Sequence, residues 1–294
     1  MLEIKKVTKN FGNHAVLKDC DLKIPSGTIF GLVGINGAGK STLLRMIAGI
    51  IKADQGKIYC DQVDTLTNPL IRKEILYLSD DCYFERSATI NSLEVLYQSF
   101  YHFDEERYNQ YLKVFGLEPN APIINFSKGM KRQVFILFAL AIKPKVILLD
   151  EAFDGLDTLI RLKIKKALFE ILEEDGATIV IASHNLKELE DICDQFGILE
   201  NGKIRQAGDL QISKEMVNKY QMAFDHEVDL YMFKPFNPLH VSSLGSVITL
   251  VIRGNLEEVK AQLQTFNPLF IDVLNVNFEE LFIYELENHG DLYE

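Results

Sequence analysis

A glycine-rich run at residues 34–42 has the composition and spacing of a phosphate-binding loop. It reads GINGAGKST and fits the pattern GxxxxGK[ST] in full. The apolar run IFGLV precedes it and the helical pattern STLLRMIAGI follows it, so we expect a buried strand, the loop and then a helix. Glycines let successive backbone N–H groups face phosphate oxygens, and a helix N-terminus adds partial positive charge. The sequence therefore predicts a nucleotide-phosphate site formed by Asn36, Gly37, Ala38, Gly39, Lys40, Ser41 and Thr42.

Two side chains of this loop have specific expected roles. The Lys40 ammonium is expected to reach the β- and γ-phosphates of a nucleotide. The Ser41 hydroxyl is expected to ligate Mg²⁺, so the metal is a predicted cofactor.

A pair of carboxylates follows a second apolar run, Val146–Leu149. Asp150 and Glu151 stand where a buried parallel strand would end, and such strand ends lie beside a phosphate loop. We expect Asp150 to hold Mg²⁺ and Glu151 to accept a proton from an attacking water. Taken alone, the pair also fits an ordinary turn at a strand end.

Apolar runs alternate with helical patterns over the first 200 or so residues. The apolar runs are continuous, which is typical of a parallel sheet buried on both faces, and the predicted fold class is α/β. The expected strands are Ile29–Gly34, Ile75–Ser79, Val146–Asp150, Thr178–Ala182 and Gly197–Glu200. The expected helices are Lys40–Ile50, Ser127–Ile142, Thr158–Glu174 and Leu186–Cys193.

The composition restricts the classes of function. The 294 residues include 31 basic and 42 acidic residues, a net charge of −11, which argues against a surface built to bind nucleic acid. The longest strongly apolar run is much shorter than a membrane span, and the N-terminus lacks the apolar segment of a signal peptide. The four cysteines show no CxxC pair, so free thiols in a reducing compartment are expected.

Three further motifs lie in a characteristic order around the phosphate loop and the Asp150-Glu151 pair. They are FSKGMKRQ at 126–133, FDGLD at 153–157 and IASH at 181–184. Over about residues 2–208, this order and spacing resemble the ATP-binding subunits of ABC transporters. FSKGM resembles the signature motif, VILLDE the Walker B strand, GLD the D-loop and Ser183-His184 the switch histidine. The resemblance implies a P-loop NTPase core that binds and hydrolyses ATP with Mg²⁺.

The resemblance also implies a head-to-tail dimer that encloses two MgATP. Ser127 and Gly129 of one subunit would close on the γ-phosphate held by the other, since a helix N-terminus presents free N–H groups to an anion. His184 would hydrogen-bond the γ-phosphate and steady the attacking water. Phe11 stands where the family places an aromatic residue that stacks on adenine, although ordinary core packing also fits it.

Two positions depart from the family pattern. Lys128 occupies the third position of the signature, where the common form has glycine. Its cation either adds to the anion site or points to solvent. Asp80 stands in the Q-loop region, where the family usually has a Pro-Gln pair whose glutamine reaches Mg²⁺. Asp80 either ligates Mg²⁺ itself or forms an exposed turn with Asp81.

The resemblance divides the chain into an ATPase domain at 1–208, with a helical subdomain at about 84–140, and a small acidic C-terminal domain at 209–294. Residues 205–294 contain 6 basic and 14 acidic residues. We expect an α+β domain here, regulatory or dimer-stabilising. Its expected strands are Glu227–Phe233, Ser246–Ile252 and Phe270–Val276, and its expected helices are Leu256–Phe266 and Phe278–Glu287.

The resemblance implies an ATPase subunit that powers transport through separate transmembrane permease subunits, as a homodimer or a heterodimer with a second ATPase subunit. Such a chain would be cytoplasmic and peripheral on the inner face of the cell membrane. The aromatic-rich segment 82–101 would form the socket for a membrane subunit, unless its aromatic residues only fill a core. The SKGM signature and the final helix resemble the drug and lantibiotic exporters. Two alternatives are a membrane-associated signalling ATPase that moves no solute and a soluble ATPase acting on nucleic acid or the ribosome.

Overall fold

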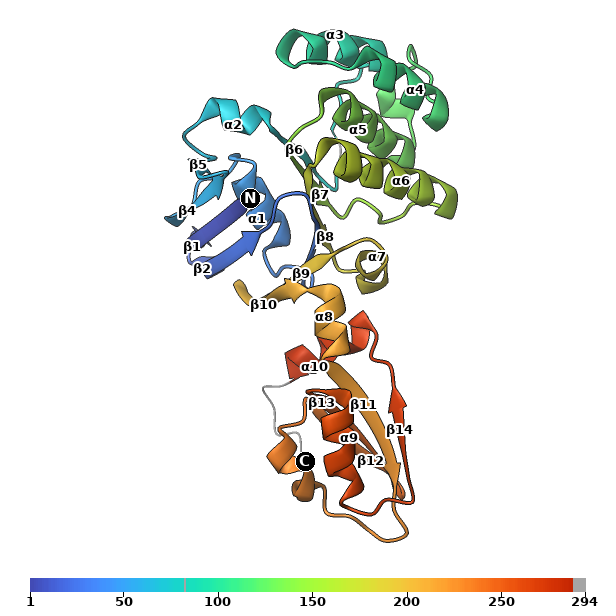
Figure 1. Cartoon of the computed structure of the whole chain (residues 1–294). Coiled ribbons are helices and arrows are strands. Elements are labelled where there is room, and N and C mark those ends of the chain that lie inside the picture. The colour runs from blue at the N-terminus through green and yellow to red at the C-terminus, as the bar shows by residue number, and fades with distance from the viewer. Residues whose placement is uncertain (82, 288–294) are drawn as a thin grey trace. The chain divides into compact units, whose positions relative to one another are not determined.

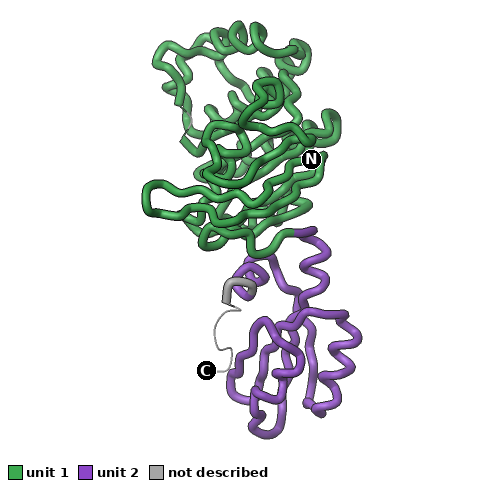
Figure 2. Tube along the Cα trace, turned by 90° about the vertical axis from the view of Figure 1, so that its left-hand side faces the viewer, with its two compact units in different colours: residues 1–207 green, residues 208–294 purple. Residues whose placement is uncertain are grey.

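The computed structural model describes residues 1–81 and 83–287, with side chains described as far as residue 284. The chain forms two compact units, Met1–Ala207 and Gly208–Glu294 (Figure 2). Each unit has its own sheet system and its own buried core.

A six-stranded sheet forms the centre of the first unit (Figure 1). Its spatial order is β10-β9-β3-β8-β7-β6, and the pairs β9/β3, β3/β8, β8/β7 and β7/β6 are parallel. Every residue of β3, β7 and β8 is buried, as a parallel sheet covered on both faces requires. The strands are β3 (Ile29–Val33), β6 (Ile75–Leu78), β7 (Val146–Asp150), β8 (Thr178–Ser183), β9 (Gln195–Glu200) and β10 (Lys203–Asp209).

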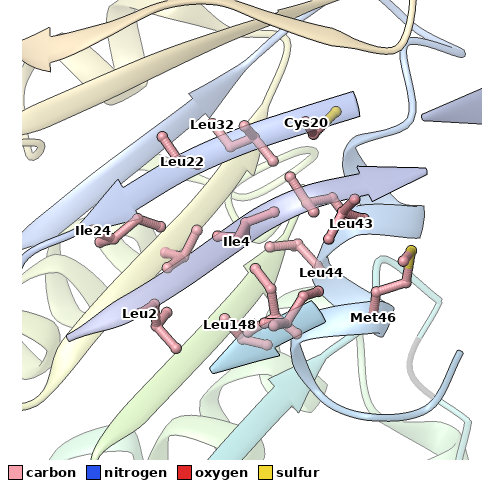
Figure 3. Packing of buried hydrophobic residues seen from close by; sticks show 14 of the residues in the cluster. Leu2, Ile4, Cys20, Leu22, Ile24, Leu32, Leu43, Leu44, Met46 and Leu148 are labelled. Atoms are coloured by element: carbon pink, nitrogen blue, oxygen red, sulfur yellow. The ribbon is translucent and has the colours of Figure 1, made fainter. Parts of the chain in front are cut away.

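A second sheet of the first unit packs over helix α1 (Lys40–Ile47). It is antiparallel, in the order β2-β1-β4-β5. Leu43 and Leu44 of α1 share one core with Leu2 of this sheet and with Leu32 and Leu148 of the parallel sheet (Figure 3). The helix that follows the phosphate loop therefore packs between two sheets. The strands are β1 (Leu2–Phe11), β2 (His14–Ile24), β4 (Gln55–Cys60) and β5 (Val63–Asp64).

Four helices form a separate layer of the first unit (Figure 1). Helix α5 is the central one, because it contacts α3, α4 and α6. Tyr97 of α3 stacks on Phe138 of α5, with ring centroids 4.5 Å apart. The helices are α3 (Ile90–Phe100), α4 (Glu105–Phe115), α5 (Lys128–Ile142) and α6 (Thr158–Asp175). The shorter helices of the unit are α2 (Pro69–Lys73), η1 (Ile123–Asn125) and α7 (Leu186–Glu190).

The second unit is a four-stranded sheet with helices, in the order β12-β13-β11-β14. All three strand pairs are antiparallel. Tyr220, Phe233 and Leu263 are fully buried in its core. Its elements are α8 (Leu210–Glu215), β11 (Val217–Ala223), η2 (Leu230–Phe236), β12 (His240–Leu244), β13 (Val247–Arg253), α9 (Leu256–Gln264), β14 (Phe270–Leu274) and α10 (Phe278–Glu287).

The α/β prediction is confirmed, and the sequence reading omitted several strands. It did not predict β1, β2, β4, β5, β10, β11 or β12. It was wrong at Glu227–Phe233, where the structure has the 3₁₀ helix η2 instead of a strand. Asp229 accepts a hydrogen bond from the Tyr231 N–H and so starts this helix. Phe233 is fully buried in the core of the second unit, and the residues of η2 that pack partly buried against this core are Leu230, Met232 and Phe236.

Two further observations concern the whole described chain. Among the described residues, none of the helices has the length and apolar character that crossing a membrane requires. Cys20, Cys60 and Cys193 are buried free thiols, and Cys82 lies outside the described residues.

Candidate active site

The site lies where four neighbouring parallel strands end. In the order β3-β8-β7-β6, each strand leads directly into a segment that carries chemically active residues. The phosphate loop follows β3, and Ser183-His184 ends β8. Asp150-Glu151 ends β7, and Asp80 lies two residues beyond β6. Because parallel strands end at the same edge of a sheet, segments that are far apart in the sequence meet here.

The phosphate loop has the tight backbone path that its glycines permit. A Cβ atom on Gly34 would collide with the Leu199 carbonyl of β9. Gly39 has φ of 107°, which is unfavourable for other residues, and it is the N-cap of α1. The first N–H groups of a helix have no partners within it, so the first turn of α1 can donate to an anion in this loop.

Lys40 is buried beneath this loop with its charge compensated. Its Nζ donates to the Gly34 carbonyl at 2.7 Å and lies 3.6 Å from Glu151 Oε1. A buried ammonium is stable only when it is paired and hydrogen-bonded. These contacts hold the ammonium at the centre of the site.

Asp150 is buried and held by two hydroxyl groups. Ser41 Oγ donates to its Oδ1 at 3.0 Å, and the Tyr77 hydroxyl donates to its Oδ2 at 3.1 Å. Burial raises the pKa of Asp150 above its usual value, and these two hydrogen bonds oppose the rise. Burial likewise raises the pKa of Tyr77 to about 12, so Tyr77 keeps its proton and remains a donor. A carboxylate beside a serine hydroxyl is an oxygen donor set that suits Mg²⁺.

Glu151 is held by contacts from the end of β8. Its Oε2 accepts hydrogen bonds from Ser183 Oγ at 3.2 Å and from the His184 N–H at 3.4 Å, and it lies 3.0 Å from His184 Nδ1. The backbone of Glu151 has φ of 48°, which costs an L-residue on the order of 1 kcal/mol. Its N–H donates to the Ala182 carbonyl at 2.9 Å, which fixes this conformation. The carboxylate is thereby directed beside Lys40.

Arg132 of α5 supports the segment that follows β7. Its side chain is buried, and its guanidinium donates to the backbone carbonyls of Glu151 and Asp154. It also lies 3.2 Å from Asp80 Oδ1. A buried arginine can supply several donors in a fixed plane. Arg132 therefore links helix α5 to the backbone that follows β7 and to Asp80.

The phosphate loop, Glu151 and Asp80 line a pocket of about 300 Å³, which is the size of a small-ligand site. Val16 of β2 completes its wall. Eight of the residues predicted from the sequence line it: Asn36, Gly37, Gly39, Lys40, Ser41, Thr42, Asp80 and Glu151.

The other predicted residues lie around this pocket or away from it. Ala38 is buried in the loop, and its N–H donates to the Ile35 carbonyl at 3.2 Å. Phe11 is 51% exposed at the end of β1, with Lys9 Nζ 5.3 Å from its ring centre. Ser127 is the N-cap of α5 and accepts a hydrogen bond from the Met130 N–H. A Cβ atom on Gly129 would press on the ends of the Ile160 and Leu156 side chains, so the glycine lets both pack closely against α5.

The two positions that depart from the family pattern contact each other. Lys128 Nζ lies 2.9 Å from Asp80 Oδ1 and 3.2 Å from Asp154 Oδ2. This position beside two carboxylates is neither of the two roles considered from the sequence, a cation at the anion site or a side chain directed to solvent. Asp80 lines the pocket and is at the same time paired with two cations of α5.

Comparison with known proteins identifies the family. A family model described as ABC transporter matches residues 17–154. The ABC transporter ATP-binding protein YtrB of Bacillus subtilis (strain 168) is 32% identical over 284 residues, covering 96% of this chain and 97% of YtrB. The chain belongs to the ATP-binding subunits of ABC transporters. It is therefore an ATP-binding protein and an ATPase of this family, and the resemblance stated from the sequence is confirmed.

Other relatives of this ABC ATPase include subunits named for import. The methionine import ATP-binding protein MetN of Clostridium tetani is 30% identical, covering 95% of this chain and 94% of MetN. Among solved structures, an ATP-binding subunit of an ABC transporter has a TM-score of 0.67 and 28% identity, covering 73% of this chain and 92% of that one. The dimeric bacterial cassette MJ0796 has a TM-score of 0.64 and 26% identity, covering 71% of this chain and 99% of that one.

Two residues of the ABC ATPase site were missed from the sequence. Tyr77 lies inside an apolar strand and looked like core. Arg132 follows the signature motif on a helix rich in apolar residues, and a lone charge among them was the available signal. Their partners come from segments remote in sequence, so the roles emerge only in the folded structure.

We expect Tyr77→Phe to shift the pH dependence of ATP hydrolysis. The ionised form of Asp150 loses a hydrogen-bond donor, so the pKa of Asp150 rises further. The acidic limb of kcat/KM, measured with saturating Mg²⁺, should move to higher pH by roughly half a unit. Tyr59→Phe, which removes a hydroxyl from β4, is the matched control and should leave the limb in place. An unshifted limb in folded Tyr77→Phe protein would contradict this account.

Proposed function

We propose that this ABC ATPase binds MgATP in the pocket beside α1 and powers export through separate transmembrane subunits. The observation that carries the proposal is that Lys40 and Glu151 meet in a pocket of ligand size at the N-terminus of α1, with Asp150 hydrogen-bonded to Ser41 of the same pocket. An ammonium and free N–H groups suit a polyphosphate, and a nearby carboxylate suits an attacking water.

The loop residues bind and position the phosphates. The backbone N–H groups of the first turn of α1 and the Lys40 ammonium face the anion and stabilise the charge that develops on the transferred phosphoryl group. Ser41 and Asp150 would hold Mg²⁺, which supplies further charge neutralisation when it is bound. The hydrogen bond from Tyr77 favours the ionised, metal-binding form of Asp150 and so opposes the effect of burial.

Glu151 is the proposed general base. Its carboxylate accepts a proton from the attacking water, and His184 and Ser183 fix its orientation. His184 is half exposed, so its imidazole is also available to a terminal phosphate. The contact between Glu151 and Lys40 holds the carboxylate near the phosphates.

The active form is proposed to be a head-to-tail dimer. Ser127 is exposed and, with Gly129, is absent from the wall of the pocket described here. Both lie at the start of the 15-residue helix α5, a position suited to an anion held by a second subunit. The solved cassette MJ0796 is described as dimeric, which supports this arrangement.

The surface proposed to meet a transmembrane subunit is α3 and the segment before it. Ile90 is the one α3 residue that is fully buried, whereas Val95, Leu96 and Phe100 are exposed. Tyr83, just before α3, is 87% exposed. Exposed apolar side chains grouped in this way are typical of a protein interface, and an ATP-binding subunit of a transporter needs a membrane partner.

Export is the proposed direction of transport, on the basis of the SKGM signature and the exporter-like final helix. MetN, CysA and PotA relatives are named for import, so the direction needs its own test.

We expect Glu151→Gln to bind ATP and to hydrolyse it at least about 100-fold more slowly, because the variant keeps the phosphate contacts and loses the base. With MgATP it should elute as a dimer in gel filtration. Lys40→Ala, the contrasting variant, should lose ATP affinity by roughly 10- to 100-fold. Wild-type turnover by Glu151→Gln would exclude Glu151 as the base, and wild-type affinity of Lys40→Ala would exclude the phosphate-loop assignment.

We expect Leu96→Asp and Phe100→Asp to release the membrane partner while ATP affinity stays at the wild-type level, because both side chains are exposed and outside the pocket. The measurement is co-purification from native membranes in mild detergent, with mass spectrometry of a stoichiometric multi-span protein. Leu162→Asp, on an exposed leucine of α6, is the matched control and should retain that protein. Equal retention by all three variants would remove α3 from the interface.

We expect the purified complex, reconstituted in vesicles with its ATPase outside, to accumulate a solute in the lumen when MgATP is added. The vesicles are incubated with a mixture of cellular metabolites, and mass spectrometry detects any solute that accumulates in the lumen. Such accumulation would show export. Loss of preloaded solute would show import. ATP hydrolysis with no solute movement would instead favour the signalling alternative.

A further inference from the structure

Asp80 places a negative charge in the wall of a pocket proposed to receive polyphosphate. It lines the same pocket as Lys40, Ser41 and Glu151. Lys40 already lies beside the Glu151 carboxylate, so its positive charge is partly neutralised before any ligand enters. An uncompensated carboxylate at Asp80 would repel an incoming polyphosphate over several ångströms.

Two cations of α5 contact this carboxylate. Lys128 Nζ lies 2.9 Å and Arg132 lies 3.2 Å from the same oxygen, Asp80 Oδ1. Lys128 also contacts Asp154 Oδ2 at 3.2 Å. The cluster therefore has two positive and two negative side chains and is close to neutral.

Lys128 and Arg132 differ in what else they hold. Arg132 is buried and donates to the carbonyls of Glu151 and Asp154, so it is committed to the backbone of that segment. Lys128 is about two-fifths exposed, and its described ammonium contacts are the two carboxylates. Lys128 is also at the first position of α5, where a helix disfavours a cation that has no nearby anion.

We propose that Lys128 is a positioning residue that neutralises and orients Asp80, so that the wall of the pocket accepts a polyphosphate. This inference rests on the proposed nucleotide function of the pocket. It explains why an acid at Asp80 and a base at Lys128 occur together in this chain. It also assigns Lys128 an indirect effect on nucleotide affinity, exerted through Asp80 and not by contact with phosphate.

A double-mutant cycle separates the indirect effect from a direct one. ATP affinity is measured by equilibrium titration at low ionic strength with EDTA, so that neither Mg²⁺ nor hydrolysis contributes. The proteins are the full-length wild type, Lys128→Met, Asp80→Asn and the double variant. We expect Lys128→Met to weaken ATP binding roughly fivefold, the size of one partly exposed ion pair. In the Asp80→Asn background, the same substitution should change affinity less than twofold.

Two controls keep the cycle interpretable. Lys131→Met removes the same charge from the same helix, and among the described residues Lys131 has no ion pair with Asp80. Its effect should be small and equal in both backgrounds. Lys128→Arg keeps the cation and should bind ATP within twofold of wild type. Unfolding temperatures verify that each variant is folded, and Lys128→Gln replaces Lys128→Met if that protein is unstable.

Several outcomes would overturn the inference. An equal loss of affinity from Lys128→Met in both backgrounds would mean that Lys128 contacts phosphate directly. No loss in either background would mean that the ion pair has no bearing on the ligand. Failure of the proposed function looks different, because wild-type protein would then bind ATP no better than Lys40→Ala. The coupling should also weaken as salt is raised, since a partly exposed ion pair is screened.

Discussion

The order of the strands in the parallel sheet is the constraint on which the site depends. The neighbours β3, β8, β7 and β6 end at one edge of the sheet. The residues that follow each strand place part of the site at that edge. Helix α1 fixes the position of the phosphate loop relative to this edge, because its apolar side chains pack between the parallel and antiparallel sheets. A displacement of β7 relative to β3 would separate Asp150 from Ser41 and Glu151 from Lys40, contacts that span 3.0 and 3.6 Å. The core thus determines the distances on which catalysis relies.

Electrostatic balance is the second requirement of this site. An anionic ligand must enter a region that contains three carboxylates, those of Asp80, Asp150 and Glu151. Lys40 lies beside Glu151, and two cations of α5 lie beside Asp80. Asp150 has hydroxyl donors instead, and burial favours its neutral form until a cation arrives. The carboxylates are therefore compensated in two ways, by ammonium or guanidinium groups for two of them and by hydroxyl donors for the third.

The sequence predicted the parts of the molecule that local patterns specify. Buried strands such as β3 and β7 are continuous apolar runs, and the phosphate loop has a strict glycine spacing, so both were found. The antiparallel strands β1 and β2 were not found. Irregular pairing between them interrupts the alternation of inward and outward residues that would indicate a strand. Segment Glu227–Phe233 was misread because Val228, Leu230 and Met232 stand at every second position, as the inward residues of a strand would, although the structure forms a 3₁₀ helix there. The pairing of Asp80 with Lys128 could not be predicted either, because residues 48 positions apart meet only through the packing of α5 against the sheet edge.

Arg132 recognises its neighbours by their backbone oxygens, at Glu151 and Asp154, and this has a consequence for sequence variation. A carbonyl group is the same at every residue type, so the brace fixes the path of the segment and leaves its side chains open to change. Outside Glu151, the proposed general base, this contact therefore places no requirement on the side chains of the loop after β7. The arginine itself has no such freedom, because a shorter or uncharged side chain would remove the guanidinium donors from both carbonyls. The same two hydrogen bonds therefore depend on the arginine side chain in helix α5 and not on the side chains of the loop residues that accept them.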